Sequence, residues 1–361
     1  MYCITPIIKL TESCNFSCDF CRYANSTESN LMDINLCKNV IWEICKFNML
    51  QHYNSIHLIF HGGEPLLWGK ENFREIIKFQ YDLCRKYKKV SFVNSLQTNG
   101  LLIDREWIKI FHELNINIGV SIDGPDELNF HHGKSSDDSK IVLDKIKLLQ
   151  EMKCKFGLLS VITNKHENRA EDYYNFLIKH NIHNVGLCYC FSNKDKSVDN
   201  DILSKFLIEL FDLYFENEYT LNIREFNSAL NKIMGGDKVC CSFCNRMKCG
   251  NYITINGNGN VGYCDTYEKN ERIMGNININ SLNSIVNSKK FKLFQEKSKK
   301  VFEDYCINCS IKHICGGGCY RHDILNSNGE VENYFCSTYK KLYNYIEEKV
   351  VRTGCEPNIL E

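Results

Sequence analysis

Three cysteines near the start of the chain have a spacing that suits an iron–sulfur cluster. Cys14, Cys18 and Cys21 form a CxxxCxxC sequence. A [4Fe-4S] cluster is normally held by four cysteines, so three thiolates leave one iron open to a substrate or a cofactor. A zinc knuckle is the alternative, but a structural zinc ion takes four ligands, and no histidine or fourth cysteine lies close to the motif. The motif therefore predicts a cluster with an open iron.

This motif resembles that of the radical S-adenosylmethionine (SAM) superfamily, because an aromatic residue, Phe20, stands directly before its last cysteine. The resemblance implies that the open iron binds the amino and carboxylate groups of SAM. It also implies that an electron cleaves SAM to methionine and a 5′-deoxyadenosyl radical, which takes a hydrogen atom from an unactivated C–H bond. In such enzymes the cofactor supplies the reactive species and the protein supplies orientation.

The elements that must position the motif alternate between short apolar strands and longer amphipathic helices. Strands are predicted at residues 4–10, 56–60, 91–96, 118–122, 156–162 and 185–189. Apolar residues at helical spacing predict helices at 36–47, 74–87, 106–114, 141–151 and 170–180. Parallel strands need such crossovers. We therefore predict an α/β fold, a partial (β/α)6 TIM-like barrel of the radical SAM type.

Glycines and polar residues follow the predicted strands, and in a barrel the chemistry lies at the C-terminal strand ends. Gly62, Gly63 and Glu64 follow the second strand in a Gly-Gly-Glu-Pro sequence. The resemblance implies that this element binds the SAM amino group, since glycine permits close backbone approach and a carboxylate suits an ammonium group. It also places Ser121 and Asp123 at the methionine and ribose parts of SAM. Shaping a turn is the alternative role for each of these residues.

A second cysteine system follows the point, near residue 204, where the alternation of strands and helices fades. Two spacings define it, Cx9Gx4C at Cys249, Gly259 and Cys264, and Cx2Cx5Cx3C at Cys306, Cys309, Cys315 and Cys319, with Cys336 following. This order resembles the SPASM domain, a cysteine-rich C-terminal extension that carries two auxiliary [4Fe-4S] clusters. A zinc ribbon is the alternative. We predict two domains, residues 1–215 and 216–361, three [4Fe-4S] clusters in all, and a tight hairpin at Gly259.

By the family pattern, the two auxiliary clusters share the later cysteines. The second cluster takes Cys306, Cys309, Cys315 and Cys336. The first takes Cys249, Cys264, Cys319 and one cysteine just upstream. Cys244 is the choice for this fourth ligand, and Cys240 and Cys241 compete because the expected spacing falls at Phe243. The remaining cysteines fit no cluster spacing and are expected to be buried small apolar side chains, namely Cys3, Cys37, Cys45, Cys84, Cys154, Cys188, Cys190 and Cys355.

Among SPASM enzymes the chain resembles anaerobic sulfatase-maturating enzymes, which oxidise a peptidyl Cys or Ser to formylglycine. The resemblance covers nearly the whole chain and includes residues 95–100, 121–125, 264–265 and 275–277. It implies that Asp265 is the base that deprotonates the substrate side chain and that Tyr23 is an active-site tyrosine. A turn residue and a packed aromatic ring are the respective alternatives.

Three features depart from that family. His61 stands where the family has Gln before the two glycines, and a histidine can titrate near neutral pH. Residues 130–134, Phe-His-His-Gly-Lys, lack the family's basic pattern. The arginine that holds the SAM carboxylate is missing from the next helix, where Lys145 is the expected substitute, as a point charge and not a bidentate fork.

Composition limits the partners of the chain. The 361 residues carry 44 Lys and Arg against 44 Asp and Glu, which argues against a nucleic-acid-binding surface. No run of about 18 apolar residues predicts a membrane span, and no secretory signal opens the chain. We expect a reducing cytoplasmic location in which the 21 cysteines serve metal ligation. The expected partners are a peptide or protein substrate and an external one-electron reductant such as a flavodoxin or ferredoxin.

Two other functions remain open. The first is maturation of a ribosomally made peptide by thioether or carbon–carbon crosslinking. The second is a non-catalytic iron–sulfur protein, which leaves the Gly-Gly-Glu-Pro sequence and the barrel pattern unexplained. The leading hypothesis is a radical SAM oxidoreductase that modifies a peptidyl Cys or Ser.

Overall fold

The computed structural model describes residues 4–21, 23–24, 31–129, 138–191, 197–217, 220–244, 246–265 and 273–354. The chain forms two compact units, each built from segments that are separated in the sequence. The first unit comprises residues 1–121, 131–156 and 250–294, and the second comprises residues 122–130, 157–249 and 295–361. This division differs from the domains 1–215 and 216–361, which stay a prediction.

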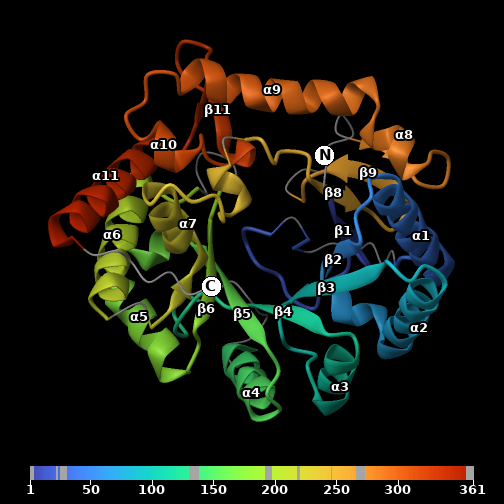
Figure 1. Cartoon of the computed structure of the whole chain (residues 1–361). Coiled ribbons are helices and arrows are strands. Elements are labelled where there is room, and N and C mark those ends of the chain that lie inside the picture. The colour runs from blue at the N-terminus through green and yellow to red at the C-terminus, as the bar shows by residue number, and fades with distance from the viewer. Residues whose placement is uncertain are drawn as a thin grey trace. The chain divides into compact units, whose positions relative to one another are not determined.

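The first unit is built on parallel strands that alternate with helices along the chain (Figure 1). Strands β1 to β4 lie side by side in sequence order, and Lys9 of β1 pairs in register with His61 of β2. On the other side of β1 lies β8, which is parallel to it and begins an antiparallel run through β9 and β10. The bounds are β1 Thr5–Lys9, β2 Ser55–His61, β3 Ser91–Thr98, β4 Ile116–Ser121, β8 Tyr252–Ile255, β9 Asn260–Tyr263 and β10 Ile273–Asn276.

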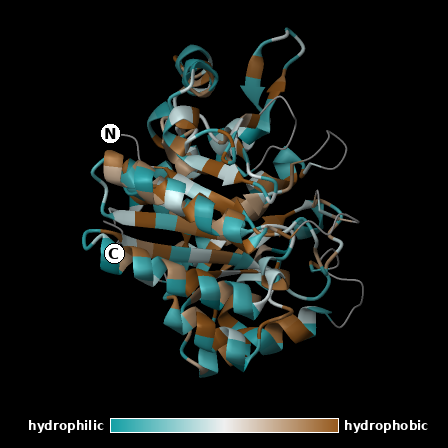
Figure 2. Cartoon of the chain, turned by 90° about the vertical axis from the view of Figure 1, so that its right-hand side faces the viewer, coloured by the Kyte–Doolittle hydropathy of each residue, from teal (hydrophilic) through white to brown (hydrophobic). Residues whose placement is uncertain are grey.

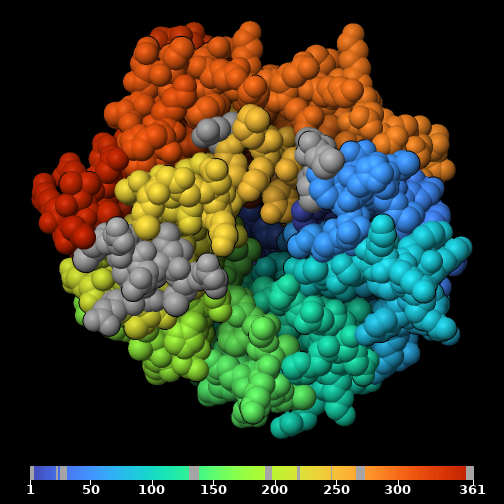
Figure 3. Space-filling model, in the orientation of Figure 1, coloured from blue at the N-terminus to red at the C-terminus, as the bar shows by residue number. Residues whose placement is uncertain are grey.

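Helices α1 and α3 of the first unit begin where a side chain satisfies free backbone N–H groups. Asp33 accepts hydrogen bonds from the first turn of α1, and Asp104 accepts one of 2.8 Å from Trp107 in α3, as N-cap residues do. The side chains of α1, α2 and α3 form one continuous outer surface (Figure 3). The bounds are α1 Ile34–Leu50, η1 Pro65–Trp68, α2 Lys70–Lys86, α3 Arg105–Glu113, α4 Asp138–Glu151 and α8 Leu282–Val286.

The core of the first unit lies between these helices and the strands. Phe60 of β2 and Phe73 of α2 are fully buried and meet edge to face, with ring centroids 5.5 Å apart. Trp107 of α3 packs on Phe73 in the same way. In Figure 2 brown bands recur along the strands, and the helices alternate brown and teal. This pattern fits amphipathic helices that bury one face against a sheet.

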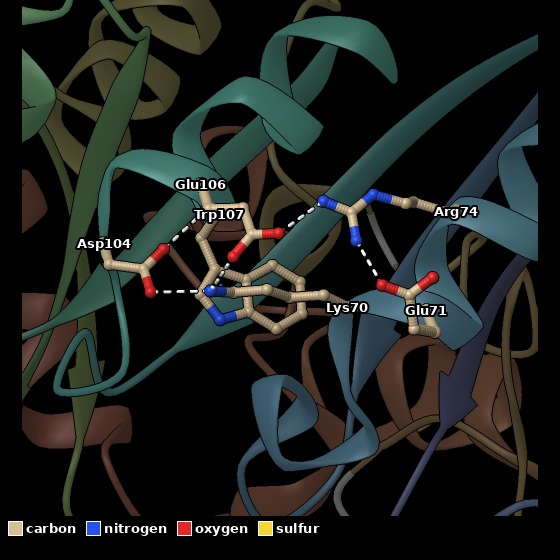
Figure 4. A network of polar contacts seen from close by, with 6 residues as sticks. All are labelled: Lys70, Glu71, Arg74, Asp104, Glu106 and Trp107. Atoms are coloured by element: carbon tan, nitrogen blue, oxygen red, sulfur yellow. Dashed lines mark hydrogen bonds and ion pairs between the residues drawn. The ribbon is translucent and has the colours of Figure 1, made fainter.

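A network of charged side chains joins the start of α2 to the start of α3 (Figure 4). Lys70 contacts Asp104 at 2.6 Å and Glu106 at 2.7 Å. Arg74 binds the other oxygen of Glu106 at 2.6 Å and pairs with Glu71 in its own helix. Because most of these groups are exposed, their main effect is to fix the relative register of two helix ends, with a small contribution to stability.

The second unit contains three parallel strands in the order β5, β6, β7. A two-stranded antiparallel ribbon, β11 and β12, lies further along the chain, and α9 (Lys289–Tyr305) runs from the first unit into the second. The strand bounds are β5 Phe156–Ile162, β6 Asn184–Tyr189, β7 Asn222–Ile223, β11 Asp323–Leu325 and β12 Val331–Asn333. The helix bounds are η2 Asn164–His166, α5 Ala170–Lys179, α6 Asn200–Glu216, α7 Arg224–Ile233, η4 Cys241–Phe243, α10 Lys312–Cys315, η6 Tyr320–His322 and α11 Cys336–Thr353.

The strands and helices predicted from the sequence are present, and most extend one to four residues beyond the predicted bounds. The hairpin at Gly259 is also present, with β8 and β9 antiparallel and Gly259 N–H donating to Asn256. Of the cysteines outside the cluster spacings, four are buried, namely Cys37, Cys45, Cys154 and Cys190. The prediction of burial is wrong for Cys84 and Cys188, which are partly exposed, and Cys3 and Cys355 lie outside the described residues. Within the described ranges, no helix combines the length and apolar character that crossing a membrane requires.

Candidate active site

The Gly-Gly-Glu-Pro turn is joined to the segment that leads into the cysteine loop by backbone hydrogen bonds. The N–H of Gly63 donates to the carbonyl of Thr11 at 2.8 Å, and the N–H of Glu64 donates to the carbonyl of Ser13 at 2.8 Å. A Cβ atom on Gly63 would lie 2.1 Å from the Ser13 oxygen, and one on Gly62 would lie 2.3 Å from the Thr11 oxygen. The two glycines are therefore required for this close approach.

The three cysteines of the predicted SAM cluster lie in this loop and are free thiols. The Cys14 sulfur accepts a hydrogen bond from the N–H of Phe16 at 3.4 Å, and the Asn99 side-chain amide lies 3.8 Å from it. Burial raises the pKa of Cys14 to about 11. A bound iron cluster would offset that effect, since a coordinated thiol is deprotonated. Three thiols in one loop, with N–H donors aimed at sulfur, fit a cluster that keeps one iron open.

Glu64 is fully buried, and its carboxylate links two strand ends. It accepts hydrogen bonds of 2.8 Å from the N–H of Asn99, 2.9 Å from the N–H of Leu66 and 2.8 Å from the hydroxyl of Thr98. Burial raises the pKa of Glu64 to about 7, although these donors favour the ionised form. The side chain thus positions the turn, and its contact with the SAM amino group stays a prediction.

The three residues predicted to be catalytic gather around a lysine that sequence reasoning did not single out. Lys9, at the end of β1, forms an ion pair with Asp265, and its ammonium nitrogen lies 5.4 Å from the centre of the Tyr23 ring. His61 Nε2 lies 3.6 Å from the second oxygen of Asp265. The available signal was a lone charge in the apolar run from Ile4 to Leu10. Within the first unit, β1, β2 and the segment after β9 therefore meet at one carboxylate, and Tyr23 contacts the lysine that binds it.

Two further residues predicted to bind SAM lie on the first unit. The Ser121 hydroxyl, at the end of β4, accepts a hydrogen bond of 2.8 Å from the side-chain amide of Gln97 in β3. Lys145 lies half-buried on α4. Residues 130–134 lie outside the described residues, so their departure from the family pattern has no structural counterpart here. The roles of Ser121 and Lys145 stay predictions.

Asp123 belongs to the second unit, where its backbone and side chain are fixed by several contacts. Its carboxylate accepts a hydrogen bond of 2.7 Å from the N–H of Val161, and its own N–H donates to the Asn129 side chain at 2.6 Å. His166 Nε2 lies 3.1 Å from the Asp123 carbonyl. Asp123 is almost fully buried. These contacts give Asp123 a structural role in the turn. Its contact with SAM stays a prediction.

Four cysteines of the second unit line one cavity, as the predicted second auxiliary cluster requires, namely Cys306, Cys309, Cys315 and Cys336. All four are free thiols. Arg246 also lines this cavity and donates to the Gly317 carbonyl at 2.9 Å. Its guanidinium group forms a bidentate ion pair with the Asp323 carboxylate, with both N–O distances 2.6 Å. Burial raises the pKa of Cys315, and the N–H of Gly317 bonds to its sulfur. Four cysteines that line one cavity, beside a cation, match the ligand number of a four-iron cluster.

The cysteines assigned to the first auxiliary cluster divide between the units. Cys244, Cys249 and Cys319 belong to the second unit, and Cys264 to the first, directly before Asp265. The Cys244 sulfur lies 3.4 Å from the Cys240 carbonyl. The Cys240 sulfur lies 3.3 Å from the Ser242 hydroxyl, and Cys241 is exposed. The choice of Cys244 over Cys240 and Cys241 stays a prediction. Within the described residues, no three His, Cys, Asp or Glu side chains converge as they would on a single metal ion.

Two family models match this chain. The radical SAM superfamily model covers residues 8–177, and the SPASM iron–sulfur cluster-binding domain covers residues 237–310. The chain therefore belongs to the radical SAM superfamily and carries a SPASM domain, as the sequence resemblance indicated. It is a radical SAM enzyme whose fold is the α/β partial barrel of that class with a cysteine-rich C-terminal region, and whose class uses SAM and [4Fe-4S] clusters.

Three relatives show what the chain is similar to. It is 28% identical to the cysteine-type anaerobic sulfatase-maturating enzyme of Clostridium perfringens, with 97% of this chain and 98% of the relative covered. The solved structure of native anSMEcpe with bound AdoMet and Cp18Cys peptide matches with a TM-score of 0.84 at 26% identity, over 97% of this chain and 98% of that one. Streptococcus suis SuiB bound to precursor peptide SuiA shares the fold, with a TM-score of 0.63 at 17% identity, over 92% of this chain and 75% of that one.

Proposed function

We propose that this enzyme oxidises a Cys or Ser residue of a peptide or protein substrate to formylglycine, using SAM and three [4Fe-4S] clusters. The observation that carries the proposal is the carboxylate of Asp265, which directly follows a predicted cluster ligand and is held by Lys9 and His61. Similarity to cysteine-type sulfatase-maturating enzymes over nearly the whole chain supports the same reaction. A flavodoxin or ferredoxin is the proposed source of the electron.

The proton acceptor proposed for this reaction is Asp265, a residue of the first unit. When bound, SAM would supply the radical that takes a hydrogen atom from the substrate Cβ, and an iron–sulfur cluster would accept the electron left behind. Asp265 takes the proton of the substrate hydroxyl or thiol, as a positioned carboxylate base does. A serine thereby becomes an aldehyde. A cysteine becomes a thioaldehyde, which water converts to the aldehyde with release of hydrogen sulfide.

Mass spectrometry of peptides after anaerobic incubation tests the proposal. The protein, reconstituted with about twelve irons if three four-iron clusters form, is incubated with SAM, dithionite and matched peptides that carry Cys, Ser or Ala at one position. The Ser peptide should lose two hydrogens, the Cys peptide should also exchange sulfur for oxygen, and both products should react with a hydrazine. The Ala peptide should remain unchanged.

Three other results would contradict the proposal or a part of it. Loss of two hydrogens without hydrazine reactivity would instead indicate a crosslink, and so the peptide-maturase function. Release of 5′-deoxyadenosine by a variant with Cys14, Cys18 and Cys21 all replaced by Ala would show that the cluster is placed wrongly. Failure of the unchanged enzyme to cleave SAM would favour the non-catalytic iron–sulfur protein.

A further inference from the structure

Lys9 is a buried cation in a position where the strand pattern calls for an apolar side chain. It is 1% exposed and stands between Ile8 and Leu10, which are fully buried. A buried ammonium group is costly unless an opposite charge and hydrogen-bond acceptors compensate it. Lysine is almost never fully buried without such a partner. The reason for a lysine at this position must therefore be sought in the group that it contacts.

The partner of Lys9 is the carboxylate of Asp265, which comes from a distant part of the sequence. The Lys9 ammonium group pairs with Oδ1 of Asp265. The Asp265 side chain is 28% exposed, whereas that of Lys9 is 1% exposed. The cation thus contacts the carboxylate from the buried side, and a part of the carboxylate stays open to other groups. This asymmetry is what a base needs, because one side of the base is fixed and another is free to receive a proton.

The second oxygen of Asp265 is near His61, whose ring is held by its own turn. The N–H of Gly62 donates to His61 Nδ1 at 2.8 Å, and the carbonyl of the same glycine lies 3.1 Å from that nitrogen. His61 Nε2 lies 3.6 Å from Asp265 Oδ2. The two carboxylate oxygens therefore have different neighbours, an ammonium group at one and an imidazole nitrogen at the other.

We propose that Lys9 is a positioning residue for the reaction, which fixes the Asp265 carboxylate in place to accept the substrate proton. The inference rests on the proposed function, because it assigns Lys9 a role through the base of that reaction. Tyr23 adds to it, since its ring lies 5.4 Å from the ammonium nitrogen and aromatic rings stabilise cations at this range. A buried ion pair is seldom more stable than an apolar pair of the same size, so stability alone does not account for Lys9.

A double-mutant cycle separates this role from a structural one. The variants are Lys9→Met, Asp265→Asn and the double variant, with Lys38→Met as the control, because Lys38 forms a more exposed ion pair with Glu75 on the same unit. Formylglycine and 5′-deoxyadenosine are measured for each protein, together with its iron content. We expect Lys9→Met to lose about tenfold or more of product formation, as the loss of support for a general base implies, and to keep SAM cleavage within about twofold.

The double variant gives the decisive comparison. If Lys9 acts through Asp265, Lys9→Met should cost no further product in the Asp265→Asn background. Independent, multiplicative losses would overturn the inference, and so would equal losses of product and SAM cleavage in Lys9→Met. Lys9→Arg, which keeps the charge, should retain more product than Lys9→Met. Lys38→Met should match the unchanged enzyme.

Thermal unfolding supplies a measure that does not depend on activity. Asp265→Asn leaves Lys9 buried without its anion and should lower the melting temperature, and adding Lys9→Met should restore it. If neither shift is seen while the unchanged enzyme makes formylglycine, the inference fails and the proposed function stands. If the unchanged enzyme makes no formylglycine but both shifts are seen, the pairing stands and the proposed function fails, together with the role of Lys9 in it.

Discussion

The backbone N–H of Gly63 donates a hydrogen bond of 2.8 Å to the carbonyl of Thr11, which joins the turn after β2 to the start of the cysteine loop. Glu64 adds a second bond of 2.8 Å, to Ser13. The predicted cofactor-binding turn and the predicted cluster loop are thus parts of one backbone structure. A change in either segment should therefore affect both cluster assembly and SAM binding.

Replacing Gly63 by Ala should disrupt that backbone structure. The added Cβ atom would lie 2.1 Å from the Ser13 carbonyl oxygen, which belongs to the backbone and has no flexible side chain to yield. We expect Gly63→Ala to lose most SAM cleavage, measured as 5′-deoxyadenosine release. We also expect it to lose part of the iron held by Cys14, Cys18 and Cys21, measured as iron per chain. The control is Gly157→Ala, whose Cβ atom would meet its nearest neighbour at an ordinary 3.4 Å. Equal activity of the two variants would contradict the argument.

Replacing Arg246 by Met should destabilise the second unit. The guanidinium group forms two bonds of 2.6 Å to Asp323, and both side chains are nearly buried. Removing one partner of a buried pair costs on the order of 3 to 5 kcal/mol, because the other charge is left uncompensated. Chemical denaturation should show this loss, together with fewer irons per chain, since Arg246 lines the four-cysteine cavity.

Two companion variants test the cause of that loss. Arg246→Met combined with Asp323→Asn should recover much of the unfolding free energy, because no charge is then left unpaired. Arg246→Lys should recover little, since an ammonium group cannot reproduce two parallel bonds to a carboxylate. Unchanged stability of Arg246→Met would show that the ion pair does not matter.

The strands and helices were largely predictable because their signals are local. The fifth strand has the predicted bounds, Phe156–Ile162, since an apolar β-rich run with turn residues on both sides leaves few alternatives. Helix starts were harder to predict. The first helix begins at Ile34, two residues before the predicted bound, because Asp33 accepts hydrogen bonds from the N–H groups of the first turn. A cap of this kind is readable in the sequence once its position is suspected.

The candidate site was predictable only in part. The cysteines and the Gly-Gly-Glu-Pro turn were found because their spacing is specific to the chemistry. Lys9 was missed, because its partner Asp265 is brought to it by the pairing of β8 with β1 and of β9 with β8. Such long-range pairing leaves no local pattern in either segment. The sole hint was a single lysine among isoleucine and leucine.

Replacing Glu106 by Gln should weaken the link between α2 and α3 in a way that depends on salt and pH. Hydrogen bonds from Arg74 and then Lys70 lower the pKa of Glu106 to about 2. Its contribution is therefore present above the ordinary value of 4.5 and is lost as pH falls toward 2. We expect a small drop in melting temperature at neutral pH that disappears in about 1 M salt. Glu113→Gln, on the same helix, is the control, and a drop that persists in high salt would contradict an electrostatic cause.

Replacing His166 by Gln should change how stability depends on pH. His166 is buried between the rings of Tyr173 and Phe206, with its Nε2 3.1 Å from the Asp123 carbonyl and its Nδ1 accepting from Thr163 at 3.1 Å. Burial lowers the pKa of His166 below its ordinary 6.5. As pH falls below 6.5, the unfolded chain binds a proton at this site that the folded chain does not, so the unfolding free energy falls.

His166→Gln removes that titration. The variant should be less stable at about pH 8, where the lost packing dominates, and its melting temperature should fall less steeply between about pH 6.5 and pH 5 than that of the unchanged protein. The exposed His112 of α3 provides the control, because His112→Gln should leave the slope nearly unchanged. An equal slope for His166→Gln and the unchanged protein would show that the buried imidazole does not titrate on unfolding.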